Sequence, residues 1–264
     1  MNTVAVIDYL VQWSTDYLQT SKQQGWVLGV SGGIDSAVVS TLAAKTGKPV
    51  LLLEMPIHQA QDQVTRAQDH IQWLQKQYNH VNTLRVDLTH TFDAMVSAMP
   101  HDPEDPERAL ALANTRSRLR MTTLYFYAGL HRYLVMGTGN KIEDFGIGFF
   151  TKYGDGGVDL SPIGDLLKSE VYQLAKELNI IPSIQNAQPT DGLFDDNRTD
   201  EDAIGASYDE LEEIMKFIEQ GIPENLSTRQ QEVLELYKRL NKATQHKINP
   251  IPVAKIPDSL RHKH

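Results

Sequence analysis

The chain has 264 residues, a formal net charge of −9 and no cysteine. This length accommodates one full α/β core, and the lack of cysteine excludes disulfides, thiolate metal sites and a cysteine nucleophile within the chain. The negative charge argues against a nucleic-acid partner. Since no apolar run is long enough to span a bilayer and the N-terminus has no signal pattern, we expect a cytoplasmic protein that does not bind membranes.

The first third of the chain alternates helices and strands. Residues 3–22 have apolar side chains at helical spacing. An apolar strand then ends in the turn Ser-Gly-Gly-Ile-Asp-Ser, at residues 31–36, and a helical run follows that Gly47 is expected to end. Residues 49–55 and 83–88 predict two more strands, with a helix over 59–77 between them. The uninterrupted apolar run at 49–55 is typical of a parallel sheet covered on both faces.

This order predicts an α/β fold with a doubly wound, mostly parallel sheet flanked by helices. A proline-rich acidic loop is expected at 100–106, a helix at 110–130 and a fourth strand at 133–137. In such a sheet, ligands collect at the carboxyl ends of the strands, where the strand order reverses. The loops after Val30, Met55 and Gly137 should therefore face one crevice.

The second half contains a long glycine-rich stretch, residues 143–162, which we expect to be irregular and functional. A helix is predicted at 165–178. The polar, acidic segment 190–202 is expected to be a mobile lid. Helices follow at 207–220 and 227–241, the second with capping-box residues Ser227 and Gln230, and the tail from 251 should be partly ordered by docking. Without an internal repeat, residues 1–264 are expected to form a single domain.

The turn at 31–36 predicts a phosphate site. Gly32 and Gly33 can adopt positive φ and have no Cβ, so a ligand can approach the backbone. The amides at the start of the helix, with Ser31 and Ser36, supply donors at one place. Because a carboxylate beside phosphates requires a cation between them, we expect Asp35 to bind Mg²⁺. No Gly-Lys-Ser/Thr follows, which excludes a Walker loop; the simpler alternative is an ordinary glycine turn.

The turn resembles the pyrophosphate loop of the N-type ATP pyrophosphatases, which cleave ATP between its α- and β-phosphates. Four later segments narrow the resemblance to ammonia-dependent NAD synthetases: Asn114-x-Arg116-x-Arg118-Leu119-Arg120-Met121, Gly148-Phe149-Phe150-Thr151-Lys152-Tyr153-Gly154-Asp155-Gly156-Gly157, Pro189-Thr190 and His246-Lys247. The resemblance implies an adenine nucleotide α-hydrolase-like fold. It also implies a ligase that uses ATP and ammonia to amidate deamido-NAD (nicotinic acid adenine dinucleotide) to NAD through an adenylated intermediate, with release of AMP and pyrophosphate. A homodimer with the deamido-NAD site at its interface is a further implication.

The resemblance also implies roles for individual residues. The ATP-binding set is Gly29, Val30, Ser31, Gly32, Gly33, Ile34, Asp35, Ser36, Thr138, Lys168 and Thr190. Asp35 and Glu143 match the Mg²⁺ ligands, and Asp35 and Lys168 match catalytic positions at the phosphates. The set that binds deamido-NAD is Arg118, Lys152, Asp159, His246 and Lys247. Considered alone, Glu143 would be a solvated loop acid, Lys168 a surface lysine and Asp159 a turn cap.

The chain departs from the common pattern at one place. Many relatives read Gly-Thr-Asp-His-Ala-Ala-Glu, whereas residues 137–143 here read Gly-Thr-Gly-Asn-Lys-Ile-Glu, with one additional residue before Gly148. The family also has a glutamine after the second strand, and this glutamine corresponds to either Gln59 or Gln61. Phe149 and Phe150 are expected to serve either in the core or in ring stacking.

Two other functions compete with this one. The first is another adenylating amidase or thiolase with the same loop, although a tRNA-thiolating enzyme normally needs cysteines and a basic face. The second is a regulatory domain that binds ATP without turnover, which does not need Asp35, Glu143 and Lys168 together. Enzymes that take nitrogen from glutamine usually carry a cysteine nucleophile, so we expect free ammonia to be the donor.

Overall fold

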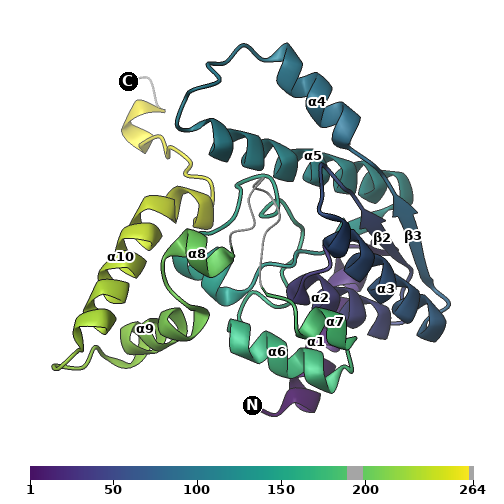
Figure 1. The fold of residues 1–264 in the computed structure, drawn as a ribbon, viewed down its shortest axis with the longest axis horizontal. Helices are drawn as coiled ribbons and strands as arrows, with labels where there is room; N and C mark the ends of the chain where they lie inside the picture. The colour runs from purple at the N-terminus through teal and green to yellow at the C-terminus, as the bar shows by residue number, and fades with distance from the viewer. Residues whose placement is uncertain (189–198, 262–264) are drawn as a thin grey trace.

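The computed structural model describes residues 1–188 and 199–261. Within them a parallel sheet has the strand order β3-β2-β1-β4 (Figure 1). Its strands are β1 (Gly25–Gly29), β2 (Val50–Glu54), β3 (Val81–Arg85) and β4 (Tyr133–Val135). Val27 pairs with Leu51 on one side and with Val135 on the other. The strand order reverses at β1, which confirms the predicted doubly wound α/β fold.

Helices cover both faces of this sheet. One face carries α1 (Thr3–Thr20), α2 (Ile34–Lys45), α3 (Gln61–Gln77), α6 (Lys168–Glu177) and α7 (Pro182–Gln185), and the other carries α4 (Thr89–Ala98) and α5 (Arg108–His131). Side chains alternate along β2, so Leu52 packs with the first group and Leu51 and Leu53 with the second. The continuous apolar run of β2 is therefore explained by burial on both faces.

A second cluster of helices forms the C-terminal lobe. It contains the π-helix η1 (Lys141–Ile147) with α8 (Asp200–Ile204), α9 (Tyr208–Gln220) and α10 (Thr228–Ile248). Figure 1 shows α9 and α10 side by side, away from the sheet. Capping boxes begin α8, α9 and α10. The box at the start of α10 is the predicted one, formed by Ser227 and Gln230.

Four short elements differ from the expectations. The sequence patterns predict neither α4 nor α7. The glycine-rich stretch does not begin irregularly, because residues 141–147 form η1. A π-helix accommodates one more residue per hydrogen-bonded turn than an α-helix, so it provides room for the additional residue before Gly148. Helix α8 begins in the segment 190–202 that is expected to be mobile, where Thr199 caps it, and continues beyond that segment. Residues 190–198 of the predicted lid lie outside the described part.

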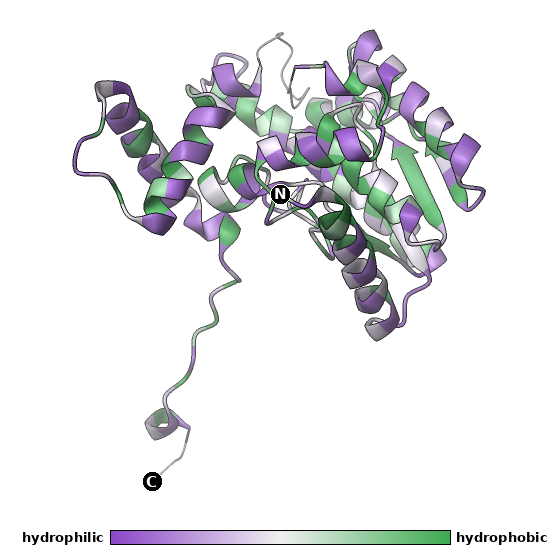
Figure 2. Cartoon of the chain, turned by 90° about the horizontal axis from the view of Figure 1, so that it is seen from below, coloured by the Kyte–Doolittle hydropathy of each residue, from purple (hydrophilic) through white to green (hydrophobic). Residues whose placement is uncertain are grey.

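The C-terminal tail leads away from the rest of the molecule (Figure 2). All residues from Asn249 to Arg261 are exposed, including Ile251 and Val253, and the short 3-10 helix η2 (Asp258–Leu260) lies near its end. These residues therefore do not dock on the rest of their own chain, and the expectation that docking orders the tail stays a prediction. Within the described residues, no helix is long and apolar enough to cross a membrane.

Candidate active site

The loops after β1, β2 and β4 open into one cavity, as the strand order predicts. Its volume is about 830 Å³, in the upper part of the range of small-molecule sites. Residues of η1, the glycine-rich run and the end of α10 complete the wall. The cavity thus lies between the sheet and the C-terminal lobe, with contributions from segments far apart in the chain.

The predicted phosphate loop forms one side of the cavity. Gly32 has φ +83°, and a Cβ on it would lie 2.6 Å from the carbonyl oxygen of Gln63, so this position requires glycine. Gly33 does not use the expected positive φ, since it is the extended N-cap of α2 with φ −91°. The Ser36 hydroxyl donates to the Gly33 carbonyl over 3.0 Å and accepts from the Ser31 amide over 3.3 Å. No described side chain caps the first turn of α2, so its amides are available to an anion.

Asp35, Glu143 and Lys168 meet next to this loop. Lys168 Nζ lies 2.7 Å from Asp35 Oδ2 and 2.9 Å from Glu143 Oε1. Asp35 belongs to the first turn of α2, Glu143 to η1, and Lys168 begins α6 with 3% of its surface exposed. The structure therefore brings together the predicted pair of metal ligands and the predicted phosphate lysine, and the alternative of a surface lysine is wrong.

The charge states of this cluster follow from burial and pairing. Burial raises the pKa of Asp35. For Glu143, the effect of burial is outweighed by Lys168 and by a hydrogen bond from Tyr208, and its pKa is lowered. Lys168 is also buried, but the two carboxylates raise its pKa above the usual value. Lys168 consequently stays protonated between the two acids.

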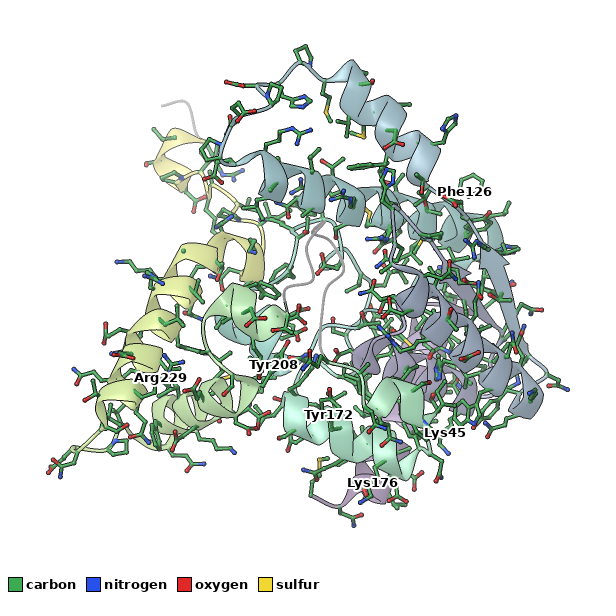
Figure 3. All side chains as sticks on the ribbon, viewed as in Figure 1. Lys45, Phe126, Tyr172, Lys176, Tyr208 and Arg229 are labelled. Atoms are coloured by element: carbon green, nitrogen blue, oxygen red, sulfur yellow. The ribbon has the colours of Figure 1, made fainter. Side chains whose placement is uncertain are left out.

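Two residues that the sequence patterns missed hold these carboxylates. Tyr208, at the start of α9, donates from Oη to Glu143 Oε1 over 2.5 Å, and Lys168 Nζ lies 4.8 Å from the centre of its ring. Figure 3 shows Tyr208 on the side of the C-terminal lobe that faces the rest of the molecule. Asn140 Nδ2 donates to Asp35 Oδ1 over 3.3 Å. Asn140 lies in the stretch 137–143 that departs from the common pattern, but the departure assigned it no role, and no local signal marks Tyr208.

The donor set next to the phosphate loop suits a magnesium ion held partly by a nucleotide. In the described part of the chain, no three His, Asp or Glu side chains are grouped so that they could hold a metal. Mg²⁺ commonly uses one or two protein carboxylates together with phosphate oxygens and water. Asp35 and Glu143 fit that arrangement, and the hydrogen bonds from Lys168 and Tyr208 both go to Glu143 Oε1.

Four of the five residues predicted to bind deamido-NAD lie together on another part of the wall. Arg118 Nε donates to the Lys152 carbonyl over 3.3 Å, and Lys152 Nζ donates to the His246 carbonyl. Lys247 Nζ donates to the Phe150 carbonyl over 2.5 Å and lies 4.8 Å from the centre of that ring. These contacts form a cationic patch suited to an anionic ligand.

Helix α5 supports this patch by holding the glycine-rich run. Thr151 Oγ1 donates to Asn114 Oδ1 over 2.6 Å, and Ser117 Oγ donates to Asp155 Oδ1 over 2.6 Å. Asn114, Ser117 and Arg118 share one face of the helix because they are three and four residues apart. The motif at residues 114–121 and the motif at residues 148–157 thus contact each other, although they lie far apart in the sequence.

The remaining predicted residues have different outcomes. Thr138 lines the cavity, and so does Gln59, whereas Gln61 does not; Thr190 lies outside the described residues. Asp159 is not part of the wall, and its carboxylate accepts from the Val135 amide over 2.8 Å and from Tyr125 Oη over 3.0 Å. Its role in binding the dinucleotide stays a prediction. Phe149 and Phe150 both line the cavity, and Phe149 also packs against the lobe.

Comparison with known proteins decides the family. A family model described as NAD synthase matches residues 6–251. The chain belongs to the NAD synthase family. The NH(3)-dependent NAD(+) synthetase of Syntrophomonas wolfei subsp. wolfei is 37% identical over 264 residues, which cover 99% of this chain and 100% of that relative.

Solved structures of the NAD synthase family and of a related enzyme have the same fold. The NMN synthetase from Francisella tularensis has a TM-score of 0.83 and 29% identity, over 98% of this chain and 99% of that chain. The NH3-dependent NAD synthetase from Campylobacter jejuni subsp. jejuni has a TM-score of 0.78 and 26% identity, over 97% and 100% of the two chains.

Proposed function

We propose that this member of the NAD synthase family is a ligase that uses ATP and ammonia to amidate deamido-NAD to NAD. The observation that supports this most is the shared cavity. One part of its wall carries the phosphate loop with Asp35, Glu143 and Lys168, and another part carries a cationic patch for a second anionic ligand. A regulatory domain that only binds ATP does not need a second site of this kind.

The chemistry explains why ATP and a dinucleotide must meet here. A carboxylate is a poor electrophile because its leaving group would be an oxide. One of its oxygens attacks the α-phosphorus of ATP and pyrophosphate leaves. Ammonia then attacks the acyl carbon, the bond to the AMP oxygen breaks, and the nitrogen loses a proton. Holding both anions in one geometry supplies much of the rate.

During these two reaction steps, groups of the protein bind and orient the reactants and neutralise their charge. The amides at the start of α2, the loop residues from Gly29 to Ser36 and Thr138 and Thr190 bind ATP. Lys168 neutralises charge that develops on the phosphates. Asp35 and Glu143 hold Mg²⁺, which supplies positive charge beside the nucleotide. Arg118, Lys152, His246 and Lys247 hold deamido-NAD; for Asp159 the structure offers no such contact within one copy.

We also propose that residues 1–264 act as one domain, in the cytoplasm, and pair as a homodimer. Tyr9, Trp13 and Tyr17 are exposed along one stripe of α1, and Phe126 and Leu130 are 64% exposed on α5. Exposed apolar side chains on a helix face often belong to interaction sites. Asp159 lies beside this surface through its contact with Tyr125, so a second copy could bring it to the dinucleotide. Light scattering should give the mass of a dimer, and Phe126→Glu should give a monomer.

One assay tests the reaction. Purified protein with MgATP, ammonium and deamido-NAD should form NAD, AMP and pyrophosphate in equal amounts. Glutamine as the sole nitrogen donor should give negligible NAD, and activity with ammonium should rise with pH as the fraction of free ammonia grows. Release of ADP and phosphate, or an absence of turnover, would refute the proposed reaction.

A second candidate is amidation of the mononucleotide. The NMN synthetase from Francisella tularensis has a TM-score of 0.83, above the 0.78 of the NAD synthetase from Campylobacter jejuni. Both reactions amidate a nicotinate carboxylate, and their substrates differ only in the AMP group. The ratio of kcat/KM for deamido-NAD to that for nicotinic acid mononucleotide, measured at the same ammonium and MgATP, distinguishes the two.

A further inference from the structure

Arg66 on α3 lies beside the phosphate loop. A Cβ on Gly32 would lie 3.3 Å from Arg66 Cβ, 2.6 Å from the Gln63 carbonyl oxygen and 3.1 Å from the Ala67 amide nitrogen, so this turn of α3 packs directly against the loop. Arg66 and Gln63 both line the cavity. The sequence patterns and the resemblance assign no role to Arg66, although its side chain belongs to the same wall as the loop.

The guanidinium of Arg66 is only partly satisfied. Its Nη1 lies 2.7 Å from Asp62 Oδ2, one turn earlier on α3, and 67% of the Asp62 side chain is exposed. Nε is covered by protein atoms and has no hydrogen-bond partner among the described residues. A buried donor without an acceptor is unfavourable, and an ion pair at the surface contributes little stability. A stronger acceptor can therefore replace Asp62.

The phosphate side of the cavity carries an excess of negative charge. Asp35 and Glu143 bring two carboxylates to it, and Lys168 is shared between them. A triphosphate carries more negative charge than a single Mg²⁺ neutralises. ATP bound next to these acids is consequently stabilised by a further cation close to the loop.

Another arginine in the wall already has a structural task. Arg120 lines the cavity, and its guanidinium donates to the Met55 carbonyl over 3.0 Å and to Gln59 Oε1 over 2.9 Å. These bonds hold the loop after β2. Arg66, by contrast, is paired with an exposed carboxylate, so its side chain can turn towards a nucleotide at a smaller cost.

We propose that Arg66 is a further catalytic residue, which leaves Asp62 when ATP binds and donates to the phosphates held by the loop. This inference rests on the proposed function. The edge of the guanidinium formed by Nε and Nη2 matches two oxygens of a phosphate, and turning this edge into the cavity gives Nε the acceptor that it lacks. In the proposed reaction pyrophosphate leaves, and a guanidinium beside it stabilises the charge that develops on it.

The first experiment measures substrate dependence. For Arg66→Gln we expect kcat to fall and the apparent KM for ATP to rise about 10-fold or more, as for loss of a charge-assisted hydrogen bond, while the KM for deamido-NAD changes less than about twofold. Arg66→Lys keeps the charge without the fork and should be intermediate. Arg239→Gln, on an exposed face of α10, is the matched control and should change none of these values. Unchanged kcat and KM for ATP in Arg66→Gln would overturn the proposal.

A second variant separates this role from support of α3. Asp62→Asn breaks the ion pair and still allows Arg66 to turn into the cavity, so its KM for ATP should be equal to that of wild type or lower. If Asp62→Asn impairs activity as much as Arg66→Gln does, Arg66 acts only through the ion pair and the proposal is refuted.

Binding measured without turnover keeps the test independent of the proposed function. Calorimetric titration with MgATP should give a Kd about 10-fold or more higher for Arg66→Gln than for wild type, whereas AMP, which lacks the β- and γ-phosphates, should bind both proteins equally. Equal affinities for MgATP would rule out the phosphate contact. Should wild-type protein form no amide product, the proposed function fails, while these affinities still decide the role of Arg66.

Discussion

At the scale of single residues, the site depends on one lysine shared by two acids. Lys168 pairs with Asp35 and Glu143, and Tyr208 adds a hydrogen bond to Glu143. Leaving a buried charge without a partner is strongly destabilising. Here either acid can be replaced by its neutral amide without leaving Lys168 unpaired, because the other carboxylate remains next to it. The effects on chemistry and on folding can therefore be separated.

Asp35→Asn and Glu143→Gln should each lower turnover by about 100-fold or more, as expected for loss of a charge beside the reacting phosphates. The free energy of unfolding should fall far less, since Lys168 keeps one carboxylate partner. Turnover as a function of Mg²⁺ concentration, with urea unfolding of the same preparations, measures both. Near-normal turnover of either variant at limiting Mg²⁺ would contradict the assignment of that residue as a metal ligand.

Tyr208→Phe removes the hydroxyl that bonds Glu143 and keeps the ring beneath Lys168. We expect turnover to fall about 10-fold, the scale of one hydrogen bond to a charged group, and half-maximal activity to need more Mg²⁺. Binding of Mn²⁺ in the presence of ATP, followed by electron paramagnetic resonance, should weaken in parallel. Tyr78→Phe, at the end of α3, is the control. If metal binding is unchanged in Tyr208→Phe, Tyr208 does not position Glu143.

At the scale of elements, η1 joins the sheet to the C-terminal lobe. Its first turn carries Glu143, and its buried Ile142 and Ile147 pack with α9 and α10. Asn140 caps η1 through Oδ1 and also donates from Nδ2 to Asp35. One buried side chain thus fixes both the helix that carries Glu143 and the carboxylate at the phosphate loop.

Two substitutions of Asn140 separate these tasks. Asn140→Ala should lower the free energy of unfolding by about 1–2 kcal/mol, as for loss of an N-cap, and should also lower turnover. Asn140→Asp keeps the acceptor for the two amides but faces Asp35 with a second carboxylate, so it should keep more stability than Asn140→Ala and still lose turnover. Chemical unfolding and the amidation assay measure the two effects. Equal stability of Asn140→Ala and wild type would show that the cap is dispensable.

At the scale of the whole molecule, the layer of helices that covers one face of the sheet contains a buried histidine. His70 on α3 is 0% exposed, its Nε2 lies 2.9 Å from Ser40 Oγ on α2, and its ring stacks on Trp73. Burial lowers its pKa from 6.5 to about 4. The folded protein keeps this imidazole neutral, which couples the packing of α2 on α3 to pH.

This coupling predicts a loss of stability in acid. Between pH 6.5 and about 4 the unfolded chain binds a proton at His70 that the folded chain does not, so stability is complete above pH 6.5 and falls as the pH is lowered. A shift of this size corresponds to about 3 kcal/mol. His70→Gln should flatten the dependence of unfolding free energy on pH in this window, whereas exposed His90→Gln should not. Parallel curves for wild type and His70→Gln would contradict the prediction.

The sequence by itself predicted the features that depend on neighbouring residues. The strand, glycine turn and helix around residues 25–45 follow from local hydrophobic pattern and backbone freedom, and they place Asp35 beside the phosphate amides. Loops at the ends of parallel strands must lie at one edge of the sheet, so the crevice was predictable as well. The resemblance added Glu143, Lys168 and the cationic residues, which local patterns alone would have assigned to the surface.

Only the tertiary structure decided which distant side chains meet. Lys168 and Asp35 are 133 residues apart and Tyr208 and Glu143 are 65 apart, so no local periodicity relates them. Local propensity determines secondary structure, but the partners of a buried charge are determined by how the sheet and the lobe pack around the cavity. That packing depends on many long-range contacts at once, so it cannot be predicted from any single stretch of the sequence.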